Sequence, residues 1–203
     1  MGIRITKPLI AILFGILLNG TTQAAVRVGQ PAPDFSGTDT RGQQLTLGEY
    51  RGNVVVLEWT NHDCPYVRKH YDSGNMQAHQ REAAENDVVW LSVISSAPGK
   101  QGHVTAAQAD ELTISRDASP SAVILDPAGD IGRLYGARTT PHMYIIDRDG
   151  TLAYMGGIDS IVSADPSDIT RATPHTRLAL REVVAGQPVK RAVTRPYGCS
   201  VKY

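Results

Sequence analysis

Two runs of mainly apolar residues, many of them β-branched, at positions 53–59 and 88–94, constrain the fold more than any other feature of the chain. A strand that is apolar at consecutive positions is typical of a sheet whose two faces are both covered by helices. A third run at residues 122–125 and a hairpin pattern around Asp149-Gly150 add further strands, with helices expected between them. These elements predict an α/β fold, with a central mixed sheet flanked by helices in a single domain.

A helix is predicted to begin directly after the first of these strands. Pro65 follows Cys64, and proline is favoured at the first position of a helix, so Cys64 would lie at the helix N-terminus. Unpaired backbone amides and partial positive charge at that end lower a thiol pKa. His62, two residues earlier, could add charge or a hydrogen bond. Cys64 is therefore a candidate nucleophile, although a structural cysteine is the alternative.

The first 24 residues have the pattern of a secretory signal peptide. Arg4 and Lys7 precede an uncharged apolar run at residues 9–18, and small residues follow it. That run is too short to cross a bilayer, and no cysteine follows the expected cleavage after Ala24 to carry a lipid anchor. We expect a periplasmic or secreted domain comprising residues 25–203, with no membrane anchor.

The charge balance of that domain is close to neutral. Without Arg4 and Lys7 it has 18 Lys and Arg residues against 20 Asp and Glu residues. Nothing in this balance favours binding to nucleic acid or to an anionic membrane.

From "VGQPAPDF" to "MGGID" the chain resembles the thioredoxin superfamily, and within it the AhpC/TSA-like redoxin group of thiol peroxidases and thiol-disulfide oxidoreductases. The most specific part is "DPAGDIGRLYGARTTPHMYIIDRDGTLAYMGG". The resemblance implies a thioredoxin-like fold in which Thr140 precedes a cis Pro141 that faces Cys64. An ordinary trans proline at the start of a strand is the alternative.

The chain departs from the family patterns at three places. Pro65, Tyr66 and Val67 follow Cys64, so no C-x-x-C dithiol exists. The peroxidase pattern P-x-x-x-T-x-x-C would need proline and threonine where Leu57 and Asn61 stand. An arginine typical of those enzymes is also displaced, to Arg138. Thiol-disulfide exchange in redox homeostasis is therefore expected ahead of peroxide reduction, without a cofactor. The partner would be a thiol or disulfide protein, a small thiol or, in the peroxidase alternative, a peroxide.

The tail at about residues 186–203 contains the other cysteine, Cys199, within "RPYGCSVKY". The resemblance implies that such a tail accompanies the single-cysteine "NHDCP" loop, with Cys199 resolving what Cys64 attacks. Because a secreted chain meets an oxidising environment, a permanent structural disulfide is the plain alternative. Independent thiols are the other.

Glu58 is a charged residue inside the first apolar run. A buried carboxylate has a raised pKa and could accept a proton from a cysteine. The resemblance implies such a buried acid at this position. Alternatively, Glu58 points to an open sheet edge, since unpaired charges are rarely buried.

A copper-binding module is a further hypothesis of a different class. His62, Cys64, His142 and Cys199 could supply imidazole and thiolate ligands to one ion. The closely spaced cysteine pair expected for Cu(I) is missing, so no metal site is predicted.

Overall fold

The computed structural model describes Met1, Gly2 and residues 26–203. Nearly all of the predicted signal peptide lies outside these described residues. The strands are β1 Ser36–Asp39, β2 Gln44–Thr46, β3 Val55–Trp59, β4 Val89–Ile94, β5 Ala122–Leu125, β6 Thr139–Thr140, β7 His142–Ile146, β8 Leu152–Gly156 and β9 Cys199–Ser200. The α-helices are α1 Pro65–Asp72, α2 Asn75–Ala84, α3 Ala106–Ser115, α4 Asp130–Tyr135 and α5 His175–Val184. Two 3₁₀ helices occur at Leu47–Tyr50 and Pro166–Thr170. Among the described residues, no helix is long and apolar enough to cross a membrane.

Seven strands form one sheet in the order β2-β1-β5-β4-β3-β7-β8. β3, β4 and β5 are parallel neighbours, whereas β7 pairs antiparallel with both β3 and β8. The sheet is therefore mixed, and the predicted fold class is confirmed.

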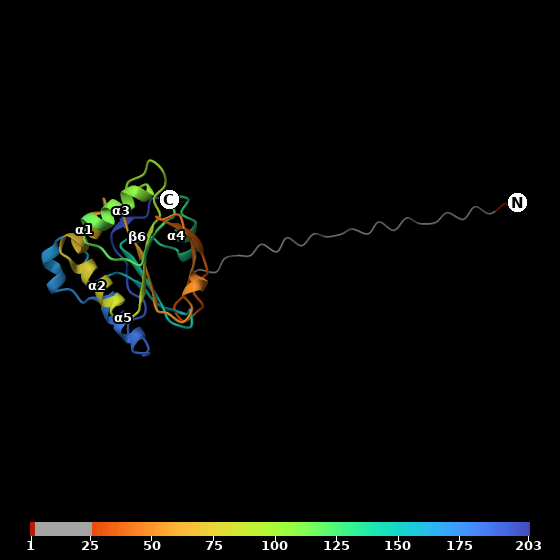
Figure 1. Cartoon of the computed structure of the whole chain (residues 1–203). Helices are drawn as coiled ribbons and strands as arrows, with labels where there is room; N and C mark the ends of the chain where they lie inside the picture. Colours follow the sequence, from red (N-terminus) through yellow and green to blue (C-terminus); the bar gives the residue numbers. More distant parts are fainter. Residues whose placement is uncertain (3–25) are drawn as a thin grey trace.

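The two faces of β3 pack into different cores, which explains why its apolar run is continuous. Val56 belongs to the core beneath α1, α2 and α5, whereas Val55 and Leu57 belong to the core that includes residues of α4. Figure 1 shows α2 and α5 on one side of the sheet and α4 on the other. Because side chains alternate along a strand, Glu58 shares the face of Val56.

The hairpin of β1 and β2 was not predicted from the sequence. Both strands are short, and their exposed positions interrupt any apolar run. They lie at one edge of the sheet, where β1 pairs with both β2 and β5. This pairing is made by backbone hydrogen bonds, which do not require a continuous apolar pattern.

The tail also forms structure that its sequence pattern does not predict. Val193 bridges to β8 at Met155, β9 pairs with β6, and Lys202 bridges to Ser96 just beyond β4. The tail therefore crosses the edge of the sheet at which β3 ends and α1 begins. This path places Cys199 at the same edge as Cys64.

Candidate active site

Cys64 occupies the N-cap of α1, and Pro65 is the first helical residue. Its carbonyl accepts hydrogen bonds from the amides of Val67 and Arg68, while its own amide donates to Asn61. The side chain is fully buried. The helix start agrees with the prediction from the proline rule.

The loop before β7 lies against this cysteine. The bond between Thr140 and Pro141 is cis, as predicted, and the Cys64 thiol donates to the Thr140 carbonyl at 3.1 Å. The Thr140 hydroxyl is buried without a hydrogen-bond partner among the described residues. The Thr140 side chain is among the groups that lower the pKa of Cys64.

Cys199 is held on the other side of the same loop. In the antiparallel pairing of β6 with β9, Cys199 lies opposite Thr140. Its backbone N–H donates to Cys64 Sγ at 3.4 Å, across 135 residues of sequence. Both cysteines are free thiols in the structure, and Cys199 is half-buried.

The two thiols have opposite electrostatic environments. Burial raises the pKa of Cys64, but hydrogen bonds from the Cys199 side chain and from the amides of Cys199 and Val67 outweigh it, so the pKa lies below its ordinary value of 9.0. Burial, together with the hydrogen bond and charge of Cys64, raises the pKa of Cys199 to about 11. Cys64 is therefore the thiol that ionises first.

This difference predicts the order of alkylation by iodoacetamide. Because the thiolate is the reactive form, the Cys64 rate should reach half its plateau below pH 9, and the Cys199 rate should do so nearer pH 11. Mass spectrometry of the reduced protein after timed quenching, from pH 5 to 11, measures both profiles. Equal rates for the two cysteines near neutral pH would contradict the assignment of Cys64 as the nucleophile.

Glu58 is fully buried, so the open-edge alternative is wrong. Its carboxylate accepts hydrogen bonds from Tyr71 Oη at 2.8 Å, Trp90 Nε1 at 2.8 Å and Ser92 Oγ at 3.0 Å. Burial raises the pKa of Glu58, and these donors oppose the shift without cancelling it. Its role as a proton acceptor for Cys64 stays a prediction.

His62 contacts Asp63 rather than the Cys64 sulfur. Its Nε2 lies 3.3 Å from Asp63 Oδ1, whereas the Cys64 sulfur donates to the Thr140 carbonyl and accepts from the Cys199 amide. Burial lowers the pKa of His62, with Asp63 opposing and Arg116 assisting the shift. A proton on His62 is thus disfavoured, and assistance to Cys64 by its charge stays an untested prediction.

The residues of the copper hypothesis do not form a ligand set. No group of three His, Cys, Asp or Glu side chains among the described residues is arranged to hold a metal ion. His142 instead accepts from the Arg138 amide at 3.4 Å and contacts Tyr144 Oη at 3.2 Å, and burial lowers its pKa to about 3.

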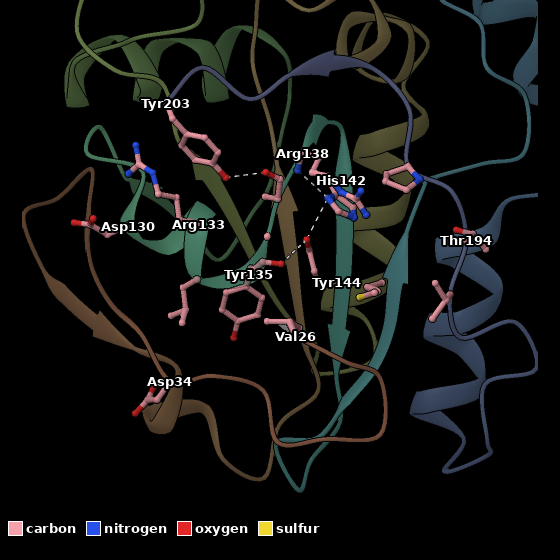
Figure 2. Close-up of a pocket in the computed structure, with 16 residues that line it drawn as sticks. Val26, Asp34, Asp130, Arg133, Tyr135, Arg138, His142, Tyr144, Thr194 and Tyr203 are labelled. Carbon is pink, nitrogen blue, oxygen red and sulfur yellow. Dashed lines mark hydrogen bonds between the residues drawn. The ribbon is translucent and has the colours of Figure 1, made fainter. Parts of the chain in front are cut away.

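A surface groove of about 1040 Å³ lies beside the cysteine pair rather than at it. Figure 2 shows His142, Arg138 and Tyr203 along this groove, which the tail borders through Thr194. Neither cysteine lines it. This groove is therefore distinct from the position of the two sulfur atoms.

Sequence reasoning missed three buried residues that join the tail to the rest of the domain: Lys69, Asp159 and, in the tail itself, Tyr197. Tyr197 stands two residues before Cys199, and that proximity was the one signal that could have identified it. Lys69 and Asp159 lie 90 residues apart, and nothing in their spacing indicates that they meet.

Comparison with known proteins agrees with this architecture. A protein named thiol-disulfide oxidoreductase ResA, from Bacillus thuringiensis subsp. konkukian, is 23% identical over 137 residues, covering 64% of this chain and 69% of that protein. A Synechocystis protein whose name assigns it provisionally to the peroxiredoxins is 30% identical over 144 residues, covering 64% of this chain and 68% of the relative.

A solved structure of an uncharacterised conserved protein from Geobacillus kaustophilus has the same fold. It superposes with a TM-score of 0.76 at 21% identity, covering 87% of this chain and 92% of that one. The sequence profile of the AhpC/TSA family matches residues 28–155, more than half of the sequence. The chain therefore belongs to the AhpC/TSA family, within the thioredoxin superfamily.

Proposed function

We propose that the protein is a periplasmic or secreted thiol-disulfide oxidoreductase in which Cys64 attacks a disulfide and Cys199 resolves the product. The observation that carries this proposal is the hydrogen bond of 3.4 Å from the Cys199 amide to Cys64 Sγ, made while β9 pairs with β6. The relative named ResA supports exchange chemistry. The signal-peptide pattern of residues 1–24 supports the location.

The reaction proceeds in two exchanges of thiolate for thiolate. The Cys64 thiolate attacks one sulfur of a partner disulfide, forming a mixed disulfide and releasing the other sulfur as a thiolate. The Cys199 thiolate then attacks Cys64 Sγ, which forms the Cys64–Cys199 disulfide and releases the partner's second sulfur. The partner gains two electrons and the two protons that the cysteines lose. A dithiol reductant returns the protein to its starting state.

The residues around sulfur are suited to this sequence. The Thr140 hydroxyl, buried without a partner, can donate to the Cys64 thiolate. Pro141 follows the Thr140 carbonyl, which accepts from the Cys64 thiol at 3.1 Å, and β6 pairs with β9 beside it. Both groups stabilise the reactive arrangement without taking part in bond exchange.

Glu58 would accept the proton that Cys64 releases. A small cavity of about 40 Å³ is lined by Tyr71 and Ser92, which both donate to Glu58, and by Thr60, whose buried hydroxyl has no partner among the described residues. Most of the cavity lining is apolar, and these three hydroxyl groups supply the polar partners that a water molecule in it would need. Such a water would connect the carboxylate to the edge of the site.

Peroxide reduction is the second candidate function, favoured by the relative assigned provisionally to the peroxiredoxins. In that case Cys64 would be oxidised to a sulfenic acid, and Cys199 would displace water to form the same disulfide. Leu57 and Asn61 stand where the peroxidase pattern needs proline and threonine, so exchange is preferred.

One experiment separates the two functions. Reduced protein under anaerobic conditions is mixed with one equivalent of either oxidised glutathione or hydrogen peroxide, and the free thiols of the protein itself are counted over time by alkylation and mass spectrometry. We expect both thiols to be lost with glutathione and only slow loss with peroxide. Loss of two thiols within seconds in peroxide would favour the peroxidase. Failure to form a Cys64–Cys199 disulfide with either oxidant would refute both.

A further inference from the structure

A buried polar network holds the tail immediately before Cys199. Tyr197 is buried, and its hydroxyl donates to Asp159 Oδ1 at 2.6 Å. Its ring packs edge-on against Tyr66, with centroids 5.8 Å apart. Tyr66 is the second residue after Cys64, so the tail is held against the same turn of α1 that carries the nucleophile.

Lys69, also from α1, completes the network. Its side chain is fully buried, and Nζ donates to Asp159 Oδ2 at 3.1 Å and to Tyr197 Oη at 3.4 Å. A buried ammonium group is tolerated only when it is paired and hydrogen-bonded. Removing Asp159 or Lys69 alone would therefore leave a buried charge unpaired, which makes the network costly to separate.

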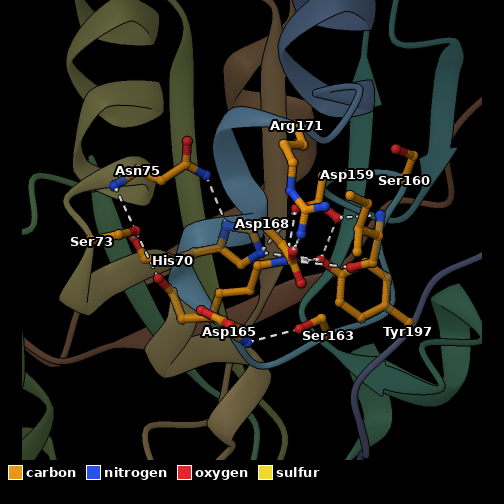
Figure 3. A network of polar contacts seen from close by, with 12 residues as sticks. His70, Ser73, Asn75, Asp159, Ser160, Ser163, Asp165, Asp168, Arg171 and Tyr197 are labelled. Atoms are coloured by element: carbon orange, nitrogen blue, oxygen red, sulfur yellow. Dashed lines mark hydrogen bonds and ion pairs between the residues drawn. The ribbon is translucent and has the colours of Figure 1, made fainter.

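His70 adds a further contact from the same helix. Figure 3 shows His70, Asp159 and Tyr197 directed toward one another. Burial lowers the pKa of His70 to about 3, so the ring is neutral. With the Asn75 amide nitrogen donating to Nδ1 at 2.8 Å, the proton is on Nε2, which donates to Tyr197 Oη at 3.3 Å. The Tyr197 hydroxyl thus accepts from Lys69 and His70 and donates to Asp159.

Only Gly198 separates this network from Cys199. Tyr197 is held on one side of Gly198 by Asp159, and Cys199 is paired with Thr140 on the other. No covalent bond joins the thiols, so non-covalent contacts keep Cys199 near Cys64: the Tyr197 network before it, the β9 pairing at it, and the bridge of Lys202 to Ser96 after it. A tail detached at Tyr197 would lose the attachment that precedes Cys199, and its pairing with β6 would then depend on the contacts at and after Cys199.

We propose that Tyr197, anchored by Lys69 and Asp159, is a positioning residue that keeps Cys199 ready to attack Cys64. The proposal rests on the proposed function of the cysteine pair. In the reduced protein the anchor increases the fraction of molecules in which the tail is seated, and that fraction multiplies both the rate and the equilibrium constant of disulfide closure. The anchor therefore sets the reduction potential of the pair as well as the stability of the tail.

The test compares full-length Tyr197→Phe with the unmodified protein. The variant loses the hydrogen bond of the hydroxyl to the charged Asp159 acceptor and those it accepts from Lys69 and His70. This loss should lower the equilibrium constant for closure about tenfold, which corresponds to a potential about 30 mV less negative. Redox titration against mixtures of reduced and oxidised glutathione, read by alkylation and mass spectrometry, measures it. The closure rate from the glutathione adduct of Cys64 should fall by a similar factor.

A matched control is Tyr135→Phe, which also removes the hydroxyl of a buried tyrosine. That hydroxyl donates to the Pro33 carbonyl at 2.7 Å and takes no part in the Tyr197 network. Its potential should match that of the unmodified protein. A second test variant, Lys69→Met with Asp159→Asn, removes the ion pair while keeping both shapes. It should shift the potential in the same direction and provides the test if Tyr197→Phe does not fold.

The outcomes are distinct. A Tyr197→Phe protein that melts at lower temperature but keeps the potential and closure rate of the unmodified protein would show that the network is only structural. An unmodified protein that forms no Cys64–Cys199 disulfide in any glutathione mixture would instead overturn the proposed function. A shift of both potential and closure rate in Tyr197→Phe, with neither in Tyr135→Phe, supports the positioning role.

Discussion

Replacing Cys199 with serine should stop turnover after the first chemical step. Cys64 would still attack a disulfide, since Pro65 and the start of α1 are unchanged. The mixed disulfide would then accumulate, because an intramolecular thiol held near Cys64 is replaced by thiols from solution. Turnover should fall at least about 100-fold, since a positioned group reacts far faster than one that diffuses in. Mass spectrometry of the quenched reaction detects the adduct.

Cys64→Ser is the matched control for this experiment, and it should form no adduct. The contrary result would be a Cys199→Ser protein that keeps full turnover but loses about 4 to 5 kcal/mol of stability, the chain-entropy value for a loop of 135 residues. That combination would assign the disulfide to structure rather than to catalysis. Unfolding by urea under oxidising conditions measures the stability of both proteins.

Replacing Gly198 with alanine should prevent the tail from taking its place beside Cys64. Gly198 has φ of +135°, and a Cβ there would lie 1.9 Å from the Thr140 carbonyl oxygen. Because this atom belongs to the backbone of the cis-proline loop, β9 must move away from β6. Backbone strain of about 1 to 3 kcal/mol should slow disulfide closure roughly 5- to 150-fold. Stopped-flow measurement of closure from the Cys64 glutathione adduct gives the rate.

Gly186→Ala provides the comparison for that result. Gly186 also has a positive φ, +67°, but an added Cβ meets nothing within 4 Å. It should lower stability slightly and leave the closure rate unchanged. Equal rates for Gly198→Ala and the unmodified protein would show that the pairing of β9 with β6 is not needed for resolution.

The sheet and the start of α1 could be predicted because their causes are local. A continuous apolar run requires a strand buried on two faces, and Pro65 favours the first turn of a helix. The sequence pattern also identified Cys64 as the cysteine at a helix start. By contrast, the hairpin of β1 and β2 depends on pairing with β5, which no local pattern of residues 36–46 indicates.

The environment of Glu58 shows where sequence reasoning reached its limit. Alternation along β3 allowed either a buried carboxylate or one at an open edge. The donors come from α1 through Tyr71 and from β4 through Trp90 and Ser92, so the choice depends on elements that meet only in the folded chain. Burial of a charged group becomes acceptable once these partners are present.

By itself, the sequence determined the α/β class, the helix start at Pro65 and the two cysteines available for chemistry. Their approach was decided by tertiary structure, because Cys64 and Cys199 are 135 residues apart and meet through strand pairing at Thr140. The anchor of Lys69, Asp159 and Tyr197 was likewise decided there, since burial and charge pairing depend on distances between segments that are remote in the chain. Local patterns follow from backbone and side-chain preferences, whereas the site follows from long-range packing.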